Sequence, residues 1–219
     1  MTSKTLTLTP VQLPAHAVVF IVDDDEAIRH SLARLFRSMR LTAKTFASAE
    51  EFLGQGEHDG PTCLVLDVQM PGLDGLGLQQ ALAGRQVQIV FLTGHCGVPQ
   101  CAHAMKAGAV DFLTKPVDDE DLLAAVSRAL ARSVEVRKAA GERIAARALL
   151  DALTPREFEV MRRVIAGLLN KQIADALGAA EKTIKIHRGR VMEKMGVSSV
   201  AELVRVAQTA GVAPMLAAT

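Results

Sequence analysis

The chain has 219 residues, of which 49% are hydrophobic and 22% are charged, which is ordinary for a globular protein and excludes a wholly disordered one. No stretch approaches the roughly 18 uninterrupted apolar residues of a membrane span, and the Thr-rich start lacks the apolar core of a signal peptide. We therefore expect a cytoplasmic protein with a flexible N-terminal arm at residues 1–15 and no membrane partner.

The net charge of +1 hides an asymmetry between the two halves of the chain. Residues 1–134 carry 11 Lys and Arg against 15 Asp and Glu, a balance of −4, whereas residues 135–219 carry 14 against 9, a balance of +5. Two modules with different partners are therefore expected, the first suited to a cation and the second to a polyanion.

Apolar runs alternate with helical patterns over residues 16–134. The predicted strands are Val18–Val22, Leu41–Phe46, Cys63–Leu66, Val87–Leu92 and Val110–Leu113. Helical spacing of apolar residues predicts helices over residues 28–39, 49–53, 75–83, 99–107 and from 118 onward. This alternation predicts an α/β domain in which helices cover both faces of a parallel sheet.

The second half shows no strand pattern. Residues 118–149 predict one long helix weakened only at Gly141, so residues 135–150 are expected to form a helical linker rather than a flexible tether. Thr154, Pro155 and Glu157 have the spacing of a capping box at a helix start. Further helices over 171–177, 181–195 and 199–210 predict an all-α domain of four helices at residues 151–219.

Polar side chains lie at the ends of four of the predicted strands: Asp23-Asp24, Asp67, Thr93 and Lys115. Because the carboxyl ends of parallel strands meet at one edge of a sheet, we expect these side chains to converge there. Three close carboxylates repel one another, and a hard divalent cation such as Mg²⁺ relieves the repulsion. Asp67 is then a candidate nucleophile toward a phosphoryl group whose oxygens Lys115 and Thr93 hold.

Taken singly, these residues and their neighbours have other interpretations. An Asp-Asp pair after a strand is usually a solvated helix start, and Met70-Pro71-Gly72 is an ordinary turn. A phosphatase with an Asp nucleophile usually has a second Asp two positions later as general acid. That position is Gln69, whose amide cannot donate a proton at neutral pH, so the phosphatase hypothesis is disfavoured.

A group of His and Cys residues lies beside Thr93: His95, Cys96, Cys101 and His103. Zinc accepts such ligands, but the spacing matches no common zinc site. The favoured interpretation is loop and core residues, with the three cysteines as free thiols. Redox control through Cys96 and Cys101 stays an alternative, which unchanged phosphorylation and dimerisation after mild oxidation would dismiss.

The predicted helix over residues 181–195 has a local charge balance of +3. Helical spacing places Ile184, His187, Val191 and Met195 on a buried stripe. The opposite side carries Lys182, Lys185, Ile186 and Gly189, a mixed basic and apolar face that suits the major groove of DNA. With the preceding helix and the turn at Gly178 this predicts a helix-turn-helix, the alternative being a solvated basic face.

Four motifs in residues 16–134 resemble the receiver domain of two-component response regulators. They are Val-Asp-Asp at 22–24, Leu-Asp-Val-Gln-Met-Pro-Gly at 66–72, Leu-Thr-Gly at 92–94 and Lys-Ala-Gly-Ala-Val-Asp-Phe-Leu-Thr-Lys-Pro at 106–116. The resemblance implies a flavodoxin-like fold, with strand order 2-1-3-4-5, that a sensor histidine kinase phosphorylates on Asp67. It implies Mg²⁺ ligation by Asp24, Asp67 and the Gln69 carbonyl, with Asp23 acting mainly through water. It further implies phosphate contact by Lys115, a cis Lys115-Pro116 bond, and switch roles for Thr93 and Phe112.

The second half resembles the LuxR-type helix-turn-helix, and the whole chain is similar to regulators of the FixJ/NarL family. The resemblance rests on Leu-Thr-Pro-Arg-Glu-Phe-Glu-Val at 153–160, Gly-Leu-Leu-Asn-Lys-Gln-Ile-Ala at 167–174, Thr-Ile-Lys-Ile-His-Arg at 183–188 and Lys-Met at 194–195. It implies base contacts by Lys185 and Ile186. The implied phosphate contacts are Lys171, Lys182, Thr183, Arg188 and Arg190.

Two positions depart from the family pattern. Ala180 replaces the usual Ser before the recognition helix, which loses an N-cap worth about 1 kcal/mol. Gly189 stands where a long basic residue often contacts DNA. Because of these two departures, the resemblance does not determine which DNA sequence the helix recognises.

The resemblance implies a phosphoacceptor regulator that is no enzyme beyond its own phosphotransfer and slow autodephosphorylation. Phosphorylation of Asp67 would drive dimerisation through the receiver domain and binding to promoter DNA, with the helix over 199–210 as a dimer contact on DNA. Contact with RNA polymerase and activation of transcription are the favoured outcome. An adaptor that only receives phosphoryl groups is the alternative, and the basic helix over 181–195 argues against it.

Overall fold

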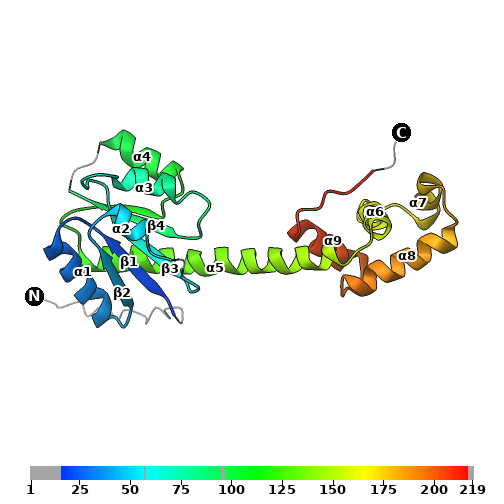
Figure 1. Cartoon of the computed structure of the whole chain (residues 1–219), viewed down its shortest axis with the longest axis horizontal. Coiled ribbons are helices and arrows are strands. Elements are labelled where there is room, and N and C mark those ends of the chain that lie inside the picture. Colours follow the sequence, from blue (N-terminus) through cyan, green and yellow to red (C-terminus); the bar gives the residue numbers. More distant parts are fainter. Residues whose placement is uncertain (1–15, 57, 95–96, 217–219) are drawn as a thin grey trace, which may run out of the picture. The chain divides into compact units, whose positions relative to one another are not determined.

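A computed structural model describes residues 16–56, 58–94 and 97–216 (Figure 1). The arm expected at residues 1–15 lies outside the described residues. The chain divides into two compact units, with the boundary between Arg137 and Lys138.

The N-terminal unit is built on a five-stranded sheet in which every paired strand runs parallel to its neighbour. Its order is β2-β1-β3-β4-β5, which confirms the predicted topology. The strands are β1 (Val18–Val22), β2 (Thr42–Phe46), β3 (Thr62–Asp67), β4 (Gln88–Thr93) and β5 (Asp111–Thr114).

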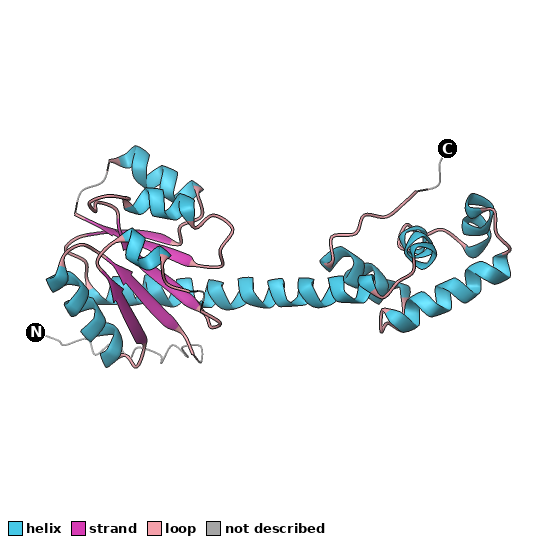
Figure 2. Cartoon of the chain, viewed as in Figure 1, coloured by secondary structure: helices cyan, strands magenta, loops and turns pink. Residues whose placement is uncertain are grey.

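Helices cover both faces of this sheet (Figure 2). Side chains alternate along a strand, so Val19 and Ile21 of β1 enter one apolar core while Val18, Phe20 and Val22 enter the other. Residues of α1 (Glu26–Ser38) and α5 (Asp119–Asp151) complete the first core. The second core is closed by α2 (Ala49–Leu53), α3 (Gly75–Ala81) and α4 (Val98–Lys106). Burial on both faces explains why the strands are near-continuous apolar runs in the sequence.

Three strands end one residue later than the sequence pattern indicates, at Asp67, Thr93 and Thr114. Asp67 and Thr93 were expected just after their strands, but each is the last residue of its strand. The reason is that the ladder continues past the apolar run, pairing Asp67 with Leu92 and Thr93 with Thr114. Both polar side chains therefore start from well-defined backbone positions.

The C-terminal unit contains only helices among its described residues. Helix α5 runs through Gly141 without a break and reaches Asp151. It is followed by α6 (Pro155–Val164), α7 (Asn170–Leu177), α8 (Glu181–Lys194) and α9 (Val200–Thr209), and α6 to α9 all contribute to one apolar core. In the described part of the chain, no helix is long and apolar enough to cross a membrane.

The predicted capping box begins α6. The Glu157 amide donates to Thr154 Oγ1 at 3.3 Å, and Glu157 Oε2 accepts from the Thr154 amide at 2.9 Å. The second contact draws the Glu157 side chain back over the helix start, where it is almost fully buried.

Candidate functional site

Three carboxylates meet at the carboxyl edge of the sheet. Asp23 and Asp24 directly follow β1, and Asp67 ends the neighbouring strand β3. One oxygen from each of the three lies within 4.8 Å of the others, close enough to bind a single metal ion. The predicted convergence of residues more than 40 positions apart is therefore found.

Lys115 joins two of these carboxylates. Its Nζ donates to Asp23 Oδ2 at 2.6 Å and to Asp67 Oδ2 at 2.7 Å. Lys115 directly follows β5 and precedes Pro116 through a cis peptide bond, as expected. The side chains of Asp23 and Asp67 are 3% and 9% exposed, so these ion pairs are shielded from solvent.

Burial and pairing shift the pKa values of this group in opposite ways. Burial raises the pKa of Asp23, and the hydrogen bond from Lys115 offsets only part of that rise. Burial alone would lower the pKa of Lys115, but its hydrogen bonds to Asp23 and Asp67 outweigh this effect and raise it. With all four groups ionised, three carboxylates face one ammonium group. The residual charge of −2 and the all-oxygen donor set fit a hard divalent cation.

Backbone amides orient the acidic side chains, and a neighbouring arginine holds the backbone of Asp23. The Asp25 amide donates to Asp23 Oδ1 at 2.9 Å, and the Gln69 amide donates to Asp67 Oδ1 at 3.1 Å. Arg29 Nη1 donates to the Asp23 carbonyl oxygen at 2.7 Å. The Gln69 side chain is exposed, and the contact with Asp67 comes from the Gln69 backbone.

The two residues expected to act as a switch lie on the neighbouring strands. Thr93 is fully buried at the end of β4, one residue beyond the ladder partner of Asp67. Phe112 on β5 is half-buried, and its ring centroid lies 5.7 Å from that of Phe91. Thr93 therefore lies on the strand next to that of Asp67, and Phe112 lies on the strand beyond it.

One supporting contact was missed by the sequence analysis. Glu50 on α2 accepts a hydrogen bond from the Leu73 amide at 3.1 Å, which ties α2 to the loop that carries Gln69. The two residues are 23 positions apart and neither belongs to a motif. Only the packing of α2 beside this loop brings them together, so the sequence offers no signal for the contact.

The His and Cys group is described only in part. His95 and Cys96 lie outside the described residues. Cys101 and His103 lie on α4, the first half-buried and the second exposed. Cys63 is buried in β3, where desolvation raises the pKa of its thiol. Within the described ranges, the acidic cluster is the only group of three or more such side chains arranged to hold a metal.

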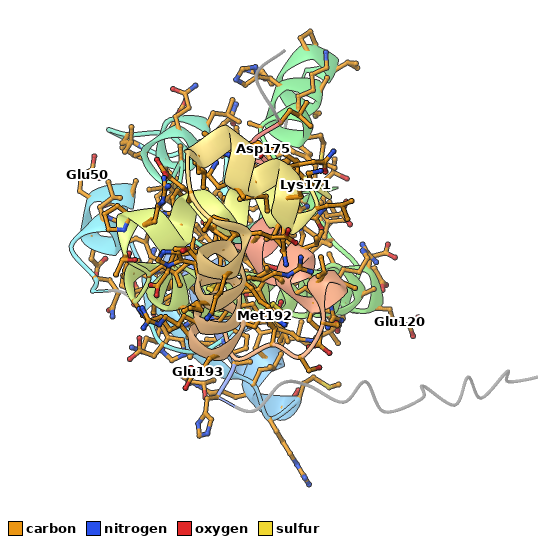
Figure 3. All side chains as sticks on the ribbon, turned by 90° about the vertical axis from the view of Figure 1, so that its right-hand side faces the viewer. Glu50, Glu120, Lys171, Asp175, Met192 and Glu193 are labelled. Carbon is orange, nitrogen blue, oxygen red and sulfur yellow. The ribbon has the colours of Figure 1, made fainter. Side chains whose placement is uncertain are left out.

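In the C-terminal unit, α8 presents the mixed face predicted for it. Ile184, Val191 and Met195 are buried, while His187 is half-buried rather than fully part of the stripe. The predicted DNA-contacting residues that are exposed are Lys171, Lys182, Thr183, Lys185, Ile186 and Arg190. Figure 3 shows Lys171 with Asp175 on α7, and Met192 with Glu193 toward the far end of α8. Arg188 differs because it is half-buried and donates to Asn170 Oδ1 on α7 at 3.1 Å.

The turn before α8 has the expected geometry. Gly178 adopts a left-handed conformation with φ +57°, which ends α7. Ala180 holds the N-cap position of α8 and offers no side-chain hydrogen bond. Gly189 is exposed, and a Cβ added there would meet nothing within 4 Å.

A charged cluster at the carboxyl edge of a parallel sheet and a helix-turn-helix unit define a signal-receiving domain followed by a DNA-binding domain. Comparison with known families agrees. Residues 19–127 match the family described as "Response regulator receiver domain", and residues 151–207 match "Bacterial regulatory proteins, luxR family". The chain therefore belongs to the two-component response regulators that carry a LuxR-type helix-turn-helix, a family of transcription regulators.

Individual relatives extend over most of the chain. Nodulation protein W of Bradyrhizobium diazoefficiens is 47% identical over 90% of this chain and 87% of its own. Transcriptional regulatory protein FixJ of Azorhizobium caulinodans is 42% identical over 94% and 96%. Among solved structures, the response regulator StyR matches with a TM-score of 0.76 and 41% identity, covering 88% of this chain and 98% of its own. These relatives therefore match the chain across both of its domains, which follow one another in the same order.

Receiver domains bind Mg²⁺ at an acidic pocket, and this chain has the corresponding cluster of aspartates. Membership of the family also implies a histidine kinase partner and binding to DNA.

Proposed function

We propose that this chain is a phosphorylation-gated regulator of transcription in which Asp67 accepts a phosphoryl group from a histidine kinase. The observation that carries the proposal is the double contact of Lys115 with Asp23 and Asp67 inside the acidic cluster. It places a fixed cation beside a nearly buried carboxylate, one oxygen of which lies within 4.8 Å of oxygens from Asp23 and Asp24.

Asp24, Asp67 and the carbonyl oxygen of Gln69 would hold Mg²⁺, with Asp23 acting mainly through water. The ion supplies the positive charge that offsets the oxygens of the transferring group. The residual charge of −2 on the cluster matches this requirement, and the oxygen ligands are of the type that Mg²⁺ selects.

In the transfer, one carboxylate oxygen of Asp67 attacks the phosphorus of the phosphohistidine. The P–N bond breaks as the new O–P bond forms, and the electron pair of the broken bond stays on the imidazole nitrogen. Lys115, 2.7 Å from Asp67 Oδ2, then bonds a phosphoryl oxygen, because formation of the acyl phosphate removes the carboxylate charge that it paired before. The Thr93 hydroxyl provides a further contact from the adjacent strand.

Repositioning of Thr93 and Phe112 would pass the phosphorylation signal to the face formed by α4, β5 and α5. We propose that this face pairs with a second copy, so that two helix-turn-helix domains occupy paired half-sites of promoter DNA. The half-buried Phe112 supports this role, since its side chain is partly open to solvent. Helix α9 would add a dimer contact on DNA, and contact with RNA polymerase would give activation of transcription.

For DNA recognition, the exposed face of α8 would enter the major groove. Lys185 and Ile186 would contact base edges and thymine methyl groups. Lys171, Lys182, Thr183 and Arg190 would bind phosphates. Arg188, paired with Asn170, would bind phosphate only if that hydrogen bond is exchanged.

The first test is intact mass after incubation with Mg²⁺ and acetyl phosphate, with Asp67→Asn as the matched variant. One added phosphoryl group, absent in the variant, is expected. Absence of the adduct in both, also with a cognate kinase, would contradict the phosphoacceptor role of Asp67.

A second measurement separates a DNA-binding regulator from an adaptor that acts only through protein contacts. The phosphorylated protein is mixed with a random DNA pool, and the retained fragments are sequenced. Enrichment of paired half-sites, with a shift from monomer to dimer that Asp67→Asn lacks, supports the proposal. A dimer without DNA enrichment would favour the adaptor.

A further inference from the structure

A second polar pocket lies at the amino edge of the receiver sheet, and none of the functions above uses it. We call it the amino-edge pocket. Its volume is about 290 Å³, and its walls come from the loops that precede β3 and β4, from β1 and α2, and from the Arg137 turn of α5. Thr62, at one end of β3, lines it, whereas Asp67, at the other end of the same strand, belongs to the acidic cluster. A strand rise of about 3.3 Å per residue separates the two sites by about 16 Å.

The charge of the pocket favours an anion. Arg85 and Arg137 both line it, and neither forms an ion pair with any carboxylate that the structure describes. Among the lining residues that the structure describes, Asp59 is the one acidic side chain. Guanidinium groups bind carboxylates and phosphates through two parallel hydrogen bonds.

Arg137 is held in place on one side only. Its Nη1 donates to the carbonyl oxygen of His58 at 3.2 Å, which fixes the guanidinium at the pocket wall. One turn earlier on α5, Ser133 Oγ accepts from the buried Thr62 amide at 3.0 Å. The wall that α5 contributes is therefore anchored to the body of the receiver before any ligand arrives.

The inner wall of the pocket is apolar and well packed. Phe20 and Phe52 are 3% and 5% exposed, and their rings meet edge to face with centroids 5.4 Å apart. Val87 adds a half-buried aliphatic side chain. A pre-formed hollow that joins an apolar wall to convergent charged groups is typical of small-molecule sites.

We propose that the amino-edge pocket binds a small organic anion, with its carboxylate or phosphate on Arg85 and Arg137 and its apolar body against Phe20 and Phe52. Such a ligand connects the loops before β3 and β4 to α5. It therefore stabilises the receiver unit independently of phosphorylation at Asp67.

The test is a titration of the full-length, isotope-labelled protein followed by NMR, in Mg²⁺-free buffer so that the acidic cluster does not compete. The probes are benzoate and phenyl phosphate, with acetate and benzyl alcohol as controls that lack the apolar body or the charge. We expect at least one aryl anion to shift the amides of Gln55, Gly56, His58, Asp59, Thr62 and residues 84–87 saturably. Acetate and benzyl alcohol should need about tenfold higher concentration for the same shifts, because each lacks either the apolar contact or the contact with the arginines. The stronger of the two anions identifies the carboxylate or the phosphate as the natural group.

Matched variants make the result decisive. Arg85→Gln changes an exposed side chain that forms no hydrogen bond or ion pair among the described residues, so it should weaken binding about tenfold and leave the fold unchanged. Arg137→Gln should act similarly, and Arg34→Gln on the exposed side of α1 should have no effect. The proposal is overturned if neither aryl anion saturates, if both control compounds bind equally well, or if Arg85→Gln binds like the unmodified chain.

Discussion

The acidic cluster of the receiver and the basic face of α8 use charge in opposite ways. In the cluster, Lys115 lies between two buried carboxylates, and the geometry exists before a ligand binds. On α8, Lys182, Lys185 and Arg190 project into solvent without a carboxylate partner in the described part of the chain. The comparison teaches that a reactive site needs charges fixed against one another, whereas a DNA-reading face needs charges left without internal partners.

The largest expected effect comes from removing the cation of the acidic cluster, which tests whether its charges stabilise one another. Lys115→Met leaves Asp23 and Asp67 facing each other in a shielded site, and we expect the receiver unit to lose about 3 kcal/mol of its free energy of unfolding at pH 7. Added Mg²⁺ should restore much of this loss, because it supplies the missing positive charge. Hydrogen exchange of the β3 amides, with and without Mg²⁺, measures both effects.

A matched control for that variant is Lys106→Met, which removes an exposed lysine at the end of α4. It should leave the protection of β3 unchanged. Equal protection in Lys115→Met and the unmodified protein would show that the ion pairs contribute no stability.

One lysine of the C-terminal unit, Lys194, is paired with a buried carboxylate, as Lys115 is, and differs in this from the solvent-exposed basic residues of α8. Lys194 Nζ donates to the buried Glu157 Oε2 at 2.6 Å. That hydrogen bond, together with the one from the Thr154 amide, lowers the pKa of Glu157 to about 2. We expect Lys194→Met to cost about 2 kcal/mol at pH 7, the usual value for a hydrogen bond to a charged group.

The pH dependence of this pair has a definite sign. Because folding lowers the pKa of Glu157 from 4.5 to about 2, its contribution is fully present above pH 4.5 and is lost as the pH falls through 2. Hydrogen exchange of the α6 amides across this window should show falling stability in the unmodified protein and a flatter profile in Lys194→Met. The same slope in both would exclude the pair as its cause.

Sequence reasoning succeeded where motifs and strand order decide position. The ends of β1, β3 and β4 and the residue after β5 fix the acidic cluster and Lys115, because parallel strands in a known order bring their carboxyl ends together. Sequence reasoning was less complete where packing between helices and loops determines which side chains meet. A helical wheel places Arg188 and Lys194 only as basic residues, but α7 presents Asn170 to the first and α6 presents Glu157 to the second. The contacts of Glu50, Ser133 and Arg137 likewise depend on which loops pack against each helix.

Base contacts and phosphate contacts on the helix-turn-helix should be separable. Lys185→Ala is expected to weaken binding to selected DNA about tenfold to a hundredfold and to leave phosphorylation of Asp67 intact. Lys171→Ala should weaken binding to all DNA alike and reduce the slope of log affinity against log salt by about 1. Fluorescence anisotropy at several salt concentrations measures both, and unchanged specific binding by Lys185→Ala would contradict its placement in the groove.

The smallest expected effect comes from adding a charge to the face of α8. Gly189 is exposed and a side chain there meets no neighbour, so Gly189→Arg should tighten binding to all DNA sequences and raise the salt slope by about 1. Gly189→Ala is the control, since it adds the helix stability of about 1 kcal/mol without the charge. If Gly189→Arg binds DNA more tightly than Gly189→Ala, position 189 lacks only a phosphate contact. If both variants bind more weakly than the unmodified protein, the α8 backbone approaches DNA so closely that only glycine fits, and affinity and sequence preference then depend on that close approach.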